Sequence, residues 1–308
     1  MNHKIKAIAA TILMAVTFAG CGAQEPPATS SIPQFTPAPE RSTQSTGEIA
    51  FTIQGKDGNN QIYALEAVEP LENSPLKGKV IYWLGSSVTV GYKAKGESMA
   101  DFIAKRNSAE CVKEAVSGTT LATQESTPET SYVSRLIGAE SNLDPTANID
   151  AFICQISTND TNEQNWPNIG ELVLEDRSLE DFDLSKTLDS VQYIIEYVHQ
   201  TWNCPIYFYS GAYFGDGGDG VRGNADPSGT HYGQLVEYVK QIAAYYDEKD
   251  GYRVGVIDLY NDEAFNASVT DSDYEYLMGD PVHPYRAGYL VWWTPYFEQY
   301  LYNEFAGA

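Results

Sequence analysis

Positive charge is scarce in this sequence, which has 19 Lys and Arg residues against 42 Asp and Glu residues and a formal net charge of −23. A negative surplus of that size repels phosphate backbones and anionic lipid surfaces at long range. We therefore expect no nucleic-acid partner. The same acidity suits a protein that faces solvent outside the cell.

Cysteine is also scarce, with four residues in 308. Cys111, Cys154 and Cys204 would remain after loss of an N-terminal leader, and an odd number does not form a disulfide framework. No second Cys or His stands at a metal-site spacing from any of the three. These cysteines are predicted to be buried free thiols, and no metal site is predicted.

Long apolar runs are absent except near the start, where residues 5–18 are mostly apolar and are preceded by Lys4. That run is too short to cross a hydrocarbon core of about 30 Å comfortably. A basic start, a short apolar stretch and small residues after it are typical of a secretory signal peptide. We expect residues 1–20 to be removed.

The signal peptide is followed directly by Cys21, and the segment Phe18-Ala-Gly-Cys21 resembles a bacterial lipobox, in which the cysteine is acylated. Leu usually stands where this sequence has Phe18, so ordinary secretion is the alternative. Residues 21–46 are rich in Pro, Ser, Thr and Gln, a composition typical of a flexible tether. We expect a lipid-anchored protein on the extracellular face of the bacterial cell envelope.

A small β segment is predicted over residues 47–75, before the main domain at 76–308. Residues 49–53 and 61–65 have strand-like composition, and turn-forming residues 55–60 separate them. This pattern predicts a short β-hairpin.

The main domain alternates short apolar runs with longer helical patterns. The expected strands are residues 79–84, 111–116, 151–156, 205–209 and 253–259, and the expected helices begin at 98 and cover 184–202, 232–246 and 286–302. This alternation predicts an α/β domain with a five-stranded parallel sheet and helices on both faces. Ligands bind such sheets beyond the carboxyl ends of the strands.

Residues suited to acyl transfer follow four of these runs. The segments are 85–91, 117–120, 157–160 and 279–284. Read alone, Gly, Ser and Thr after a strand more often mark only a helix entrance. Four such segments at the same edge of one sheet favour a catalytic site.

A serine hydroxyl becomes a good nucleophile when a histidine accepts its proton, and Ser87 and His283 fit these roles. Asp280, three residues before His283, can fix the histidine tautomer. The oxyanion of the tetrahedral intermediate needs preorganised N–H donors. We expect these from the backbone of Ser87, the backbone of Gly118 and the side chain of Asn159.

Together these segments resemble the four sequence blocks of the SGNH hydrolases, also called GDSL esterases. Residues 85–87 match the first block, Gly118 the second, 157–160 the third and 280–283 the last. The sequence has Ser86 in place of Asp and Ser157 in place of Gly. The resemblance implies a flavodoxin-like three-layer α/β/α sandwich, a Ser-His-Asp triad and no metal or organic cofactor.

Two further features leave alternatives open. His231, at the start of an expected helix, is a rival base. The loop 211–229 is rich in Gly and Asp, which favours a pocket wall in which Tyr213, Phe214 and Arg222 touch substrate, with a calcium site as the alternative.

The expected function is hydrolysis of short-chain esters, acetyl esters above all, on an envelope or environmental polysaccharide. The acyl and sugar preferences rest on analogy with the family, since a fold does not determine a substrate. The alternatives are a lysophospholipase or thioesterase of the same fold and a non-catalytic glycan- or solute-binding lipoprotein.

Overall fold

The computed structural model describes residues 57–213 and 229–305. The expected signal peptide, the acylation site Cys21, the tether and the first strand of the expected hairpin lie outside this part of the chain. Among the helices that are described, none is long and apolar enough to cross a membrane.

Five parallel strands form one sheet in the order β2-β1-β3-β4-β5. Their bounds are β1 Val80–Gly85, β2 Glu110–Ala115, β3 Ala151–Gln155, β4 Ile206–Tyr209 and β5 Val254–Ile257. The chain moves outward from β1 to β2 and then returns past β1 to β3, so the strand order reverses between β1 and β3. A crevice at the carboxyl ends of these two strands is where such a sheet binds its ligand.

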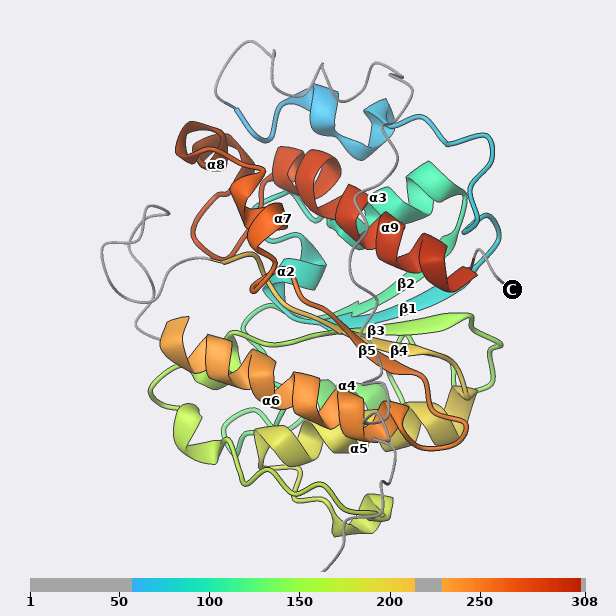
Figure 1. Cartoon of the computed structure of the whole chain (residues 1–308), viewed down its shortest axis with the longest axis vertical. Coiled ribbons are helices and arrows are strands. Elements are labelled where there is room, and N and C mark those ends of the chain that lie inside the picture. The colour runs from blue at the N-terminus through green and yellow to red at the C-terminus, as the bar shows by residue number, and fades with distance from the viewer. Residues whose placement is uncertain (1–56, 214–228, 306–308) are drawn as a thin grey trace, which may run out of the picture. The chain divides into compact units, whose positions relative to one another are not determined.

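Helices cover both faces of the sheet, as Figure 1 shows. The helices are α2 Ser87–Val90, α3 Met99–Asn107, α4 Tyr132–Ile137, α5 Thr187–Trp202, α6 Gly229–Asp247, α7 Glu263–Ala267, α8 Asp271–Leu277 and α9 Thr294–Phe305. In this view α3 and α9 lie on one side of the sheet, and α4, α5 and α6 lie on the other. The predicted three-layer α/β/α sandwich is confirmed.

Each face of the sheet has its own hydrophobic core, because side chains alternate along a strand. In β1, Tyr82 and Leu84 pack into the cluster under α5 and α6, whereas Ile81 and Trp83 pack into the cluster under α3 and α9. The inner strands β1, β3 and β4 are almost wholly buried, which explains why they are mostly apolar, whereas the edge strand β2 is partly exposed and carries Glu110, Lys113 and Glu114.

The prediction of a second hairpin strand at residues 61–65 is wrong. Residues Gln61–Tyr63 and Leu65–Ala67 form two 3-10 turns. The Asn60 side chain accepts a hydrogen bond from the Ile62 N–H and so caps the first turn. That N–H is then not available to pair with a neighbouring strand. Tyr63 and Val68 then pack into the α3 and α9 core, so the segment is held by burial instead of by strand pairing.

The last predicted helix is present but begins as a π-helical segment, Gly288–Trp293, which runs into α9. Pro295 has no N–H to donate to the carbonyl of residue 291, so a wider turn precedes it. The wide turn buries Tyr289 and Trp293 completely.

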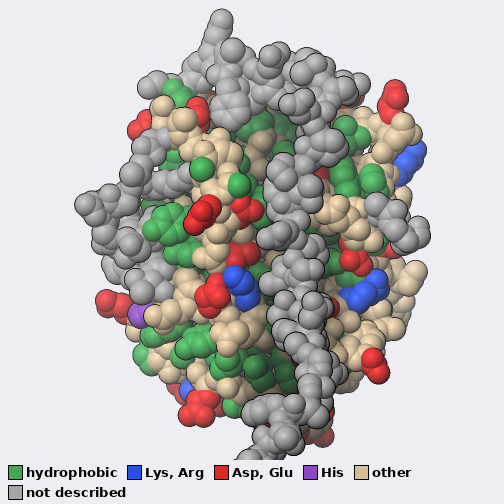
Figure 2. All heavy atoms as spheres, in the orientation of Figure 1, with side chains coloured by type: hydrophobic (Ala, Val, Ile, Leu, Met, Phe, Trp, Pro, Cys, Tyr) green, Lys and Arg blue, Asp and Glu red, His purple; other side chains and the backbone are tan. Residues whose placement is uncertain are grey.

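The predicted free thiols are present. Cys154 and Cys204 are buried and Cys111 is half-buried, and each is a free thiol. Burial raises the pKa of Cys111 and of Cys204 to about 12, so neither is a ready nucleophile. On the face seen in Figure 2, the acidic side chains are spread over several elements and do not form one patch.

Candidate active site

The turn after β1 holds Ser87 at the carboxyl edge of the sheet, where the short helix α2 begins (Figure 1). Gly91 ends this helix in the left-handed conformation, with φ of 83°, and its N–H donates back to the carbonyl oxygens of Ser87 and Val88. At Gly85 an added Cβ would lie 1.7 Å from Thr89 Oγ1. Only glycine therefore lets the strand turn so tightly into the helix.

Ser87, His283 and Asp280 form one chain of hydrogen bonds, although Ser87 and His283 are 196 residues apart. Ser87 Oγ lies 2.7 Å from His283 Nε2. On the other side of the ring, His283 Nδ1 lies 2.8 Å and 2.9 Å from the two carboxylate oxygens of Asp280. When Nδ1–H donates to Asp280, Nε2 is left to accept the serine proton, which is the arrangement that a general base needs.

Hydrogen bonds within the loop that carries His283 fix its shape. Asp280 Oδ1 accepts hydrogen bonds from the N–H groups of Val282, at 3.0 Å, and His283, at 2.8 Å. The Gly279 N–H donates to the His283 carbonyl oxygen at 2.8 Å and closes the loop. The aspartate and histidine are thus positioned as one unit.

Asp280 is half-buried, and burial by itself favours the neutral acid. The hydrogen bonds and charge of His283, with the backbone donor of Val282, outweigh burial and lower the pKa of Asp280 below its usual range. Lys93 Nζ, 3.9 Å from Asp280 Oδ2, adds a nearby positive charge. Asp280 is therefore ionised at neutral pH.

The three expected oxyanion donors lie at the ends of three adjacent strands. The N–H of Ser87 is at the first residue of α2, where it has no partner within the helix. Gly118 is exposed, has φ of 81° and has open space where a Cβ would be. Asn159 Nδ2 donates to the Thr119 carbonyl oxygen at 2.8 Å, which connects the third loop to the second and leaves one amide N–H for a ligand.

A buried polar network behind Ser87 was not predicted. Gln155 Oε1 accepts hydrogen bonds from the Ser86 N–H at 2.9 Å and from the Thr89 hydroxyl at 2.8 Å, and Gln155 Nε2 donates to Ser86 Oγ at 3.0 Å. Ser86, which stands where the SGNH blocks usually have Asp, is thus fully buried and hydrogen-bonded to Gln155. A Gln in an otherwise apolar strand was the available signal, because a buried amide must find partners.

Asp160 has a structural role that its presence in the third sequence block did not predict. Its carboxylate is 1% exposed and accepts hydrogen bonds from the Leu121 N–H at 2.8 Å and the Thr187 hydroxyl at 2.9 Å. It thus joins the loops after β2 and β3 to the start of α5. Burial raises the pKa of Asp160 to about 6, although its hydrogen bonds oppose the shift.

We expect this buried carboxyl to give stability a distinctive pH dependence. An unfolded Asp loses its proton near pH 4, whereas folded Asp160 keeps it to about pH 6. Between these values the folded state binds more protons, so the free energy of unfolding should fall as pH rises, by on the order of 2 to 3 kcal/mol.

Denaturant unfolding of the wild type and of Asp160→Asn at pH 4 and pH 6.5 measures this effect as a difference between the two proteins, which cancels the other titrating groups. A wild type that gains stability relative to the variant over this range would show that the hydrogen bonds outweigh burial.

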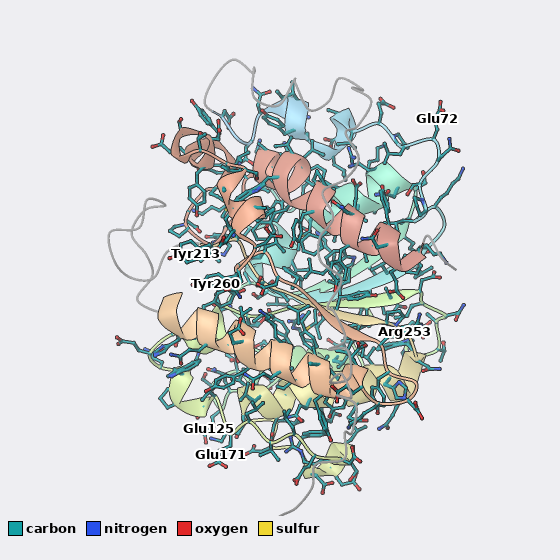
Figure 3. All side chains as sticks on the ribbon, in the orientation of Figure 1. Glu72, Glu125, Glu171, Tyr213, Arg253 and Tyr260 are labelled. Atoms are coloured by element: carbon teal, nitrogen blue, oxygen red, sulfur yellow. The ribbon has the colours of Figure 1, made fainter. Side chains whose placement is uncertain are left out.

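Two of the other candidates, Tyr213 and His231, have partners outside the triad. Tyr213 donates its backbone N–H to Asn266, and its ring lies 5.2 Å from that of Tyr260, beside it in Figure 3. His231 stacks on Trp166 at 4.3 Å. Phe214 and Arg222 lie outside the described residues. Within residues 57–213 and 229–305, no three His, Cys, Asp or Glu side chains form a metal-binding group.

Comparison with known proteins found no matching family model and no matching curated protein. Among solved structures, a carbohydrate acetylesterase family member from Sinorhizobium meliloti is 14% identical over 74% of this chain and 99% of its own, with a TM-score of 0.47. The inhibitor-bound aryl esterase of M. smegmatis is 13% identical over 73% and 99%, with a TM-score of 0.46.

A carbohydrate esterase family 2 enzyme of Corynascus thermopiles (Myceliophthora fergusii) is 15% identical over 77% of this chain and 69% of its own, with a TM-score of 0.44. Likeness at these identities concerns the fold. The five-stranded parallel sheet between two helical layers is the fold that the resemblance to SGNH hydrolases implied.

Proposed function

We propose that this protein is a serine esterase with Ser87 as nucleophile, His283 as general base and acid, and Asp280 as the group that orients His283. The observation that carries the proposal is the continuous hydrogen-bond chain from Ser87 Oγ through His283 to Asp280, with distances of 2.7 to 2.9 Å. A protein that only binds a ligand has no need of an oriented base on a serine hydroxyl.

In the first half of the reaction, Ser87 Oγ attacks the ester carbonyl carbon while His283 Nε2 takes its proton. The N–H groups of Ser87, Gly118 and Asn159 stabilise the oxyanion. As the intermediate collapses, His283 returns the proton to the leaving oxygen, the alcohol departs and the acyl group remains on Ser87. Water then attacks the acyl-enzyme by the same route and releases the acid.

The described surroundings of Ser87 favour a short acyl group. A cavity of about 10 Å³ is lined in part by Val88, Thr158 and Val282, which are the sequence neighbours of Ser87, Asn159 and His283. That volume holds about one water molecule. An acetyl methyl group suits it better than the long chain of a lysophospholipid.

An exposed aromatic ring at the site supports a carbohydrate as the alcohol. Tyr92 is 58% exposed, its ring lies 5.4 Å from the ring of His283, and its N–H donates to the Ser87 carbonyl oxygen at 3.0 Å. Because His283 protonates the leaving oxygen, the alcohol departs on the side that Tyr92 borders. A sugar ring can stack on its exposed face, and the expected lipid anchor would hold the enzyme among envelope glycans.

We expect Tyr92→Ala to lower kcat/KM for acetylated oligosaccharides about 3- to 10-fold, because one aromatic stacking contact contributes about 0.5 to 1.5 kcal/mol. Ethyl acetate, which has no ring to stack, should be hydrolysed at the wild-type rate. Steady-state kinetics on both esters provides the measurement.

Leu174→Ala is the control for Tyr92→Ala, because Leu174 is also exposed, at 40%, and lies in the loop whose Asp176 pairs with Lys249 after α6. Equal losses on both esters in Tyr92→Ala would contradict a sugar-stacking role.

The proposed function is tested by hydrolysis of a chromogenic acetyl ester and its longer-chain homologues, with fluorophosphonate labelling of Ser87. Rates that fall steeply with chain length would support a short-acyl esterase. A preference for long chains would favour the lysophospholipase or thioesterase alternative. No turnover and no labelling would reject catalysis and favour a binding protein.

A further inference from the structure

Arg135, in α4, is a buried cation close to the candidate active site. The residue is 8% exposed, and its guanidinium pairs with the equally buried side chain of Glu114 at 3.1 Å. A buried ion pair of this kind often contributes little net stability, because both charges lose their hydration. The positions of its remaining hydrogen bonds therefore say more about its role than the pairing does.

All five N–H donors of the guanidinium are used. Nε donates to the Thr130 carbonyl oxygen at 2.9 Å, and Nη1 donates to the carbonyl oxygen and carboxylate of Glu114 at 2.8 and 3.1 Å. Nη2 donates to the Gly85 carbonyl oxygen at 2.8 Å and to Thr119 Oγ1 at 3.2 Å. The planar fork thus contacts the ends of β1 and β2 at once, a geometry that Lys cannot reproduce.

These contacts fall beside the expected oxyanion donors. Gly85 is two residues before Ser87, and Thr119 directly follows Gly118. The Thr119 carbonyl oxygen in turn accepts the hydrogen bond from Asn159 Nδ2. One bonded path therefore runs from the turn of Ser87 through Arg135 and Thr119 to Asn159, and it spans the loops of all three donors.

We infer that Arg135 is a positioning residue that sets the spacing between the nucleophile turn and the Gly118 loop, and hence the geometry of the oxyanion hole. The inference rests on the proposed function. Donors must lie at hydrogen-bond distance from the developing oxyanion, and a misplacement of about 1 Å can cost about 100-fold in rate. Arg135 acts through these loops and does not touch the substrate.

The test compares Arg135→Lys and Arg135→Met with Arg106→Lys and Arg106→Met. Arg106 is the matched control, because it also forms a largely buried pair, with Glu298 at 2.7 and 3.1 Å, but between α3 and α9 and not at the carboxyl ends of the strands. Both pairs of variants lose a buried guanidinium, so both should lower the midpoint of denaturant unfolding. Only the Arg135 variants should lower kcat, by about 100-fold, with KM changed less than about 3-fold.

Affinity for a small alkylboronic acid provides a measurement that a general loss of stability would not change. Ser87 Oγ adds to the boron, its proton passes to His283, and the tetrahedral anionic adduct places an oxygen where the oxyanion forms. Affinity for this acid should fall in the Arg135 variants by the same factor as kcat/KM, and it should stay unchanged in the Arg106 variants.

Thr119→Val keeps both charges and removes the hydroxyl contacts to Nη2 and to the Val116 carbonyl oxygen, so it provides a second variant should those of Arg135 fail to fold. It should lower kcat and boronic acid affinity together, by about 10-fold. Unchanged kcat, or lowered kcat with unchanged boronic acid affinity, in a folded variant of an active enzyme would overturn this inference alone. A wild type inert to esters and to fluorophosphonate would overturn the proposed function and the inference with it.

Discussion

Ser87→Ala is expected to lower kcat/KM for ester hydrolysis by about 10⁵- to 10⁶-fold, since covalent catalysis ends when the nucleophile is removed. His283→Ala should cost as much, because Ser87 Oγ, 2.7 Å from His283 Nε2, then has no base. The double variant should be no worse than either single variant, because the two residues act as a unit. Steady-state kinetics on a chromogenic acetyl ester measures all three.

His231→Ala is the control for His283→Ala. His231 stacks on Trp166 and its Nδ1 lies 3.2 Å from the Thr161 carbonyl oxygen, so its loss should change kcat/KM less than about 3-fold. Activity that survives His283→Ala and disappears in His231→Ala would reverse the assignment of the base.

Asp280→Asn has the second largest expected effect, a loss of about 10⁴-fold in kcat. The amide can donate an N–H to His283 Nδ1 and so favours the tautomer in which Nε2 carries the proton and cannot accept that of Ser87. KM should change little, because no contact with substrate is lost.

Asp262→Asn is a suitable control for Asp280→Asn, because Asp262 also accepts a backbone N–H, from Phe265 at 2.7 Å, but caps α7.

Because the pKa of Asp280 is lowered, its ionised form contributes stability above about pH 4 that is lost as pH falls through the folded pKa. In the neutral range Asp280 therefore stays ionised in the wild type. More than a tenth of wild-type kcat in the Asp280→Asn variant would show that the backbone alone orients His283.

Several features of the fold could be predicted because they depend on neighbouring residues. Most of the strands are short apolar runs between helical patterns, and all five were located within a few residues of their observed bounds. Asp280 and His283 are three residues apart on one short loop, so their side chains are close enough to form a hydrogen bond. The hairpin prediction was wrong because the Asn60 cap and the burial of Tyr63 outweigh the strand-like composition of residues 61–65.

The supporting residues could not be predicted, because their partners come from distant parts of the chain. Gln155 meets Ser86 across 69 positions, and Arg135 meets Gly85 across 50. Neither residue belongs to a block of the SGNH resemblance, and a polar residue in a short strand or helix does not indicate which carbonyl it will reach.

The sequence by itself determined the class of fold and the closeness of Asp280 to His283, because hydrophobic periodicity and short loops are local properties. Only the tertiary structure decided the strand order, the meeting of Ser87 with His283 and the path from Arg135 through Thr119 to Asn159. The physical reason is that parallel strands pair through the packing of whole layers, and the carboxyl ends of β1, β2 and β3 become neighbours only when that packing is complete.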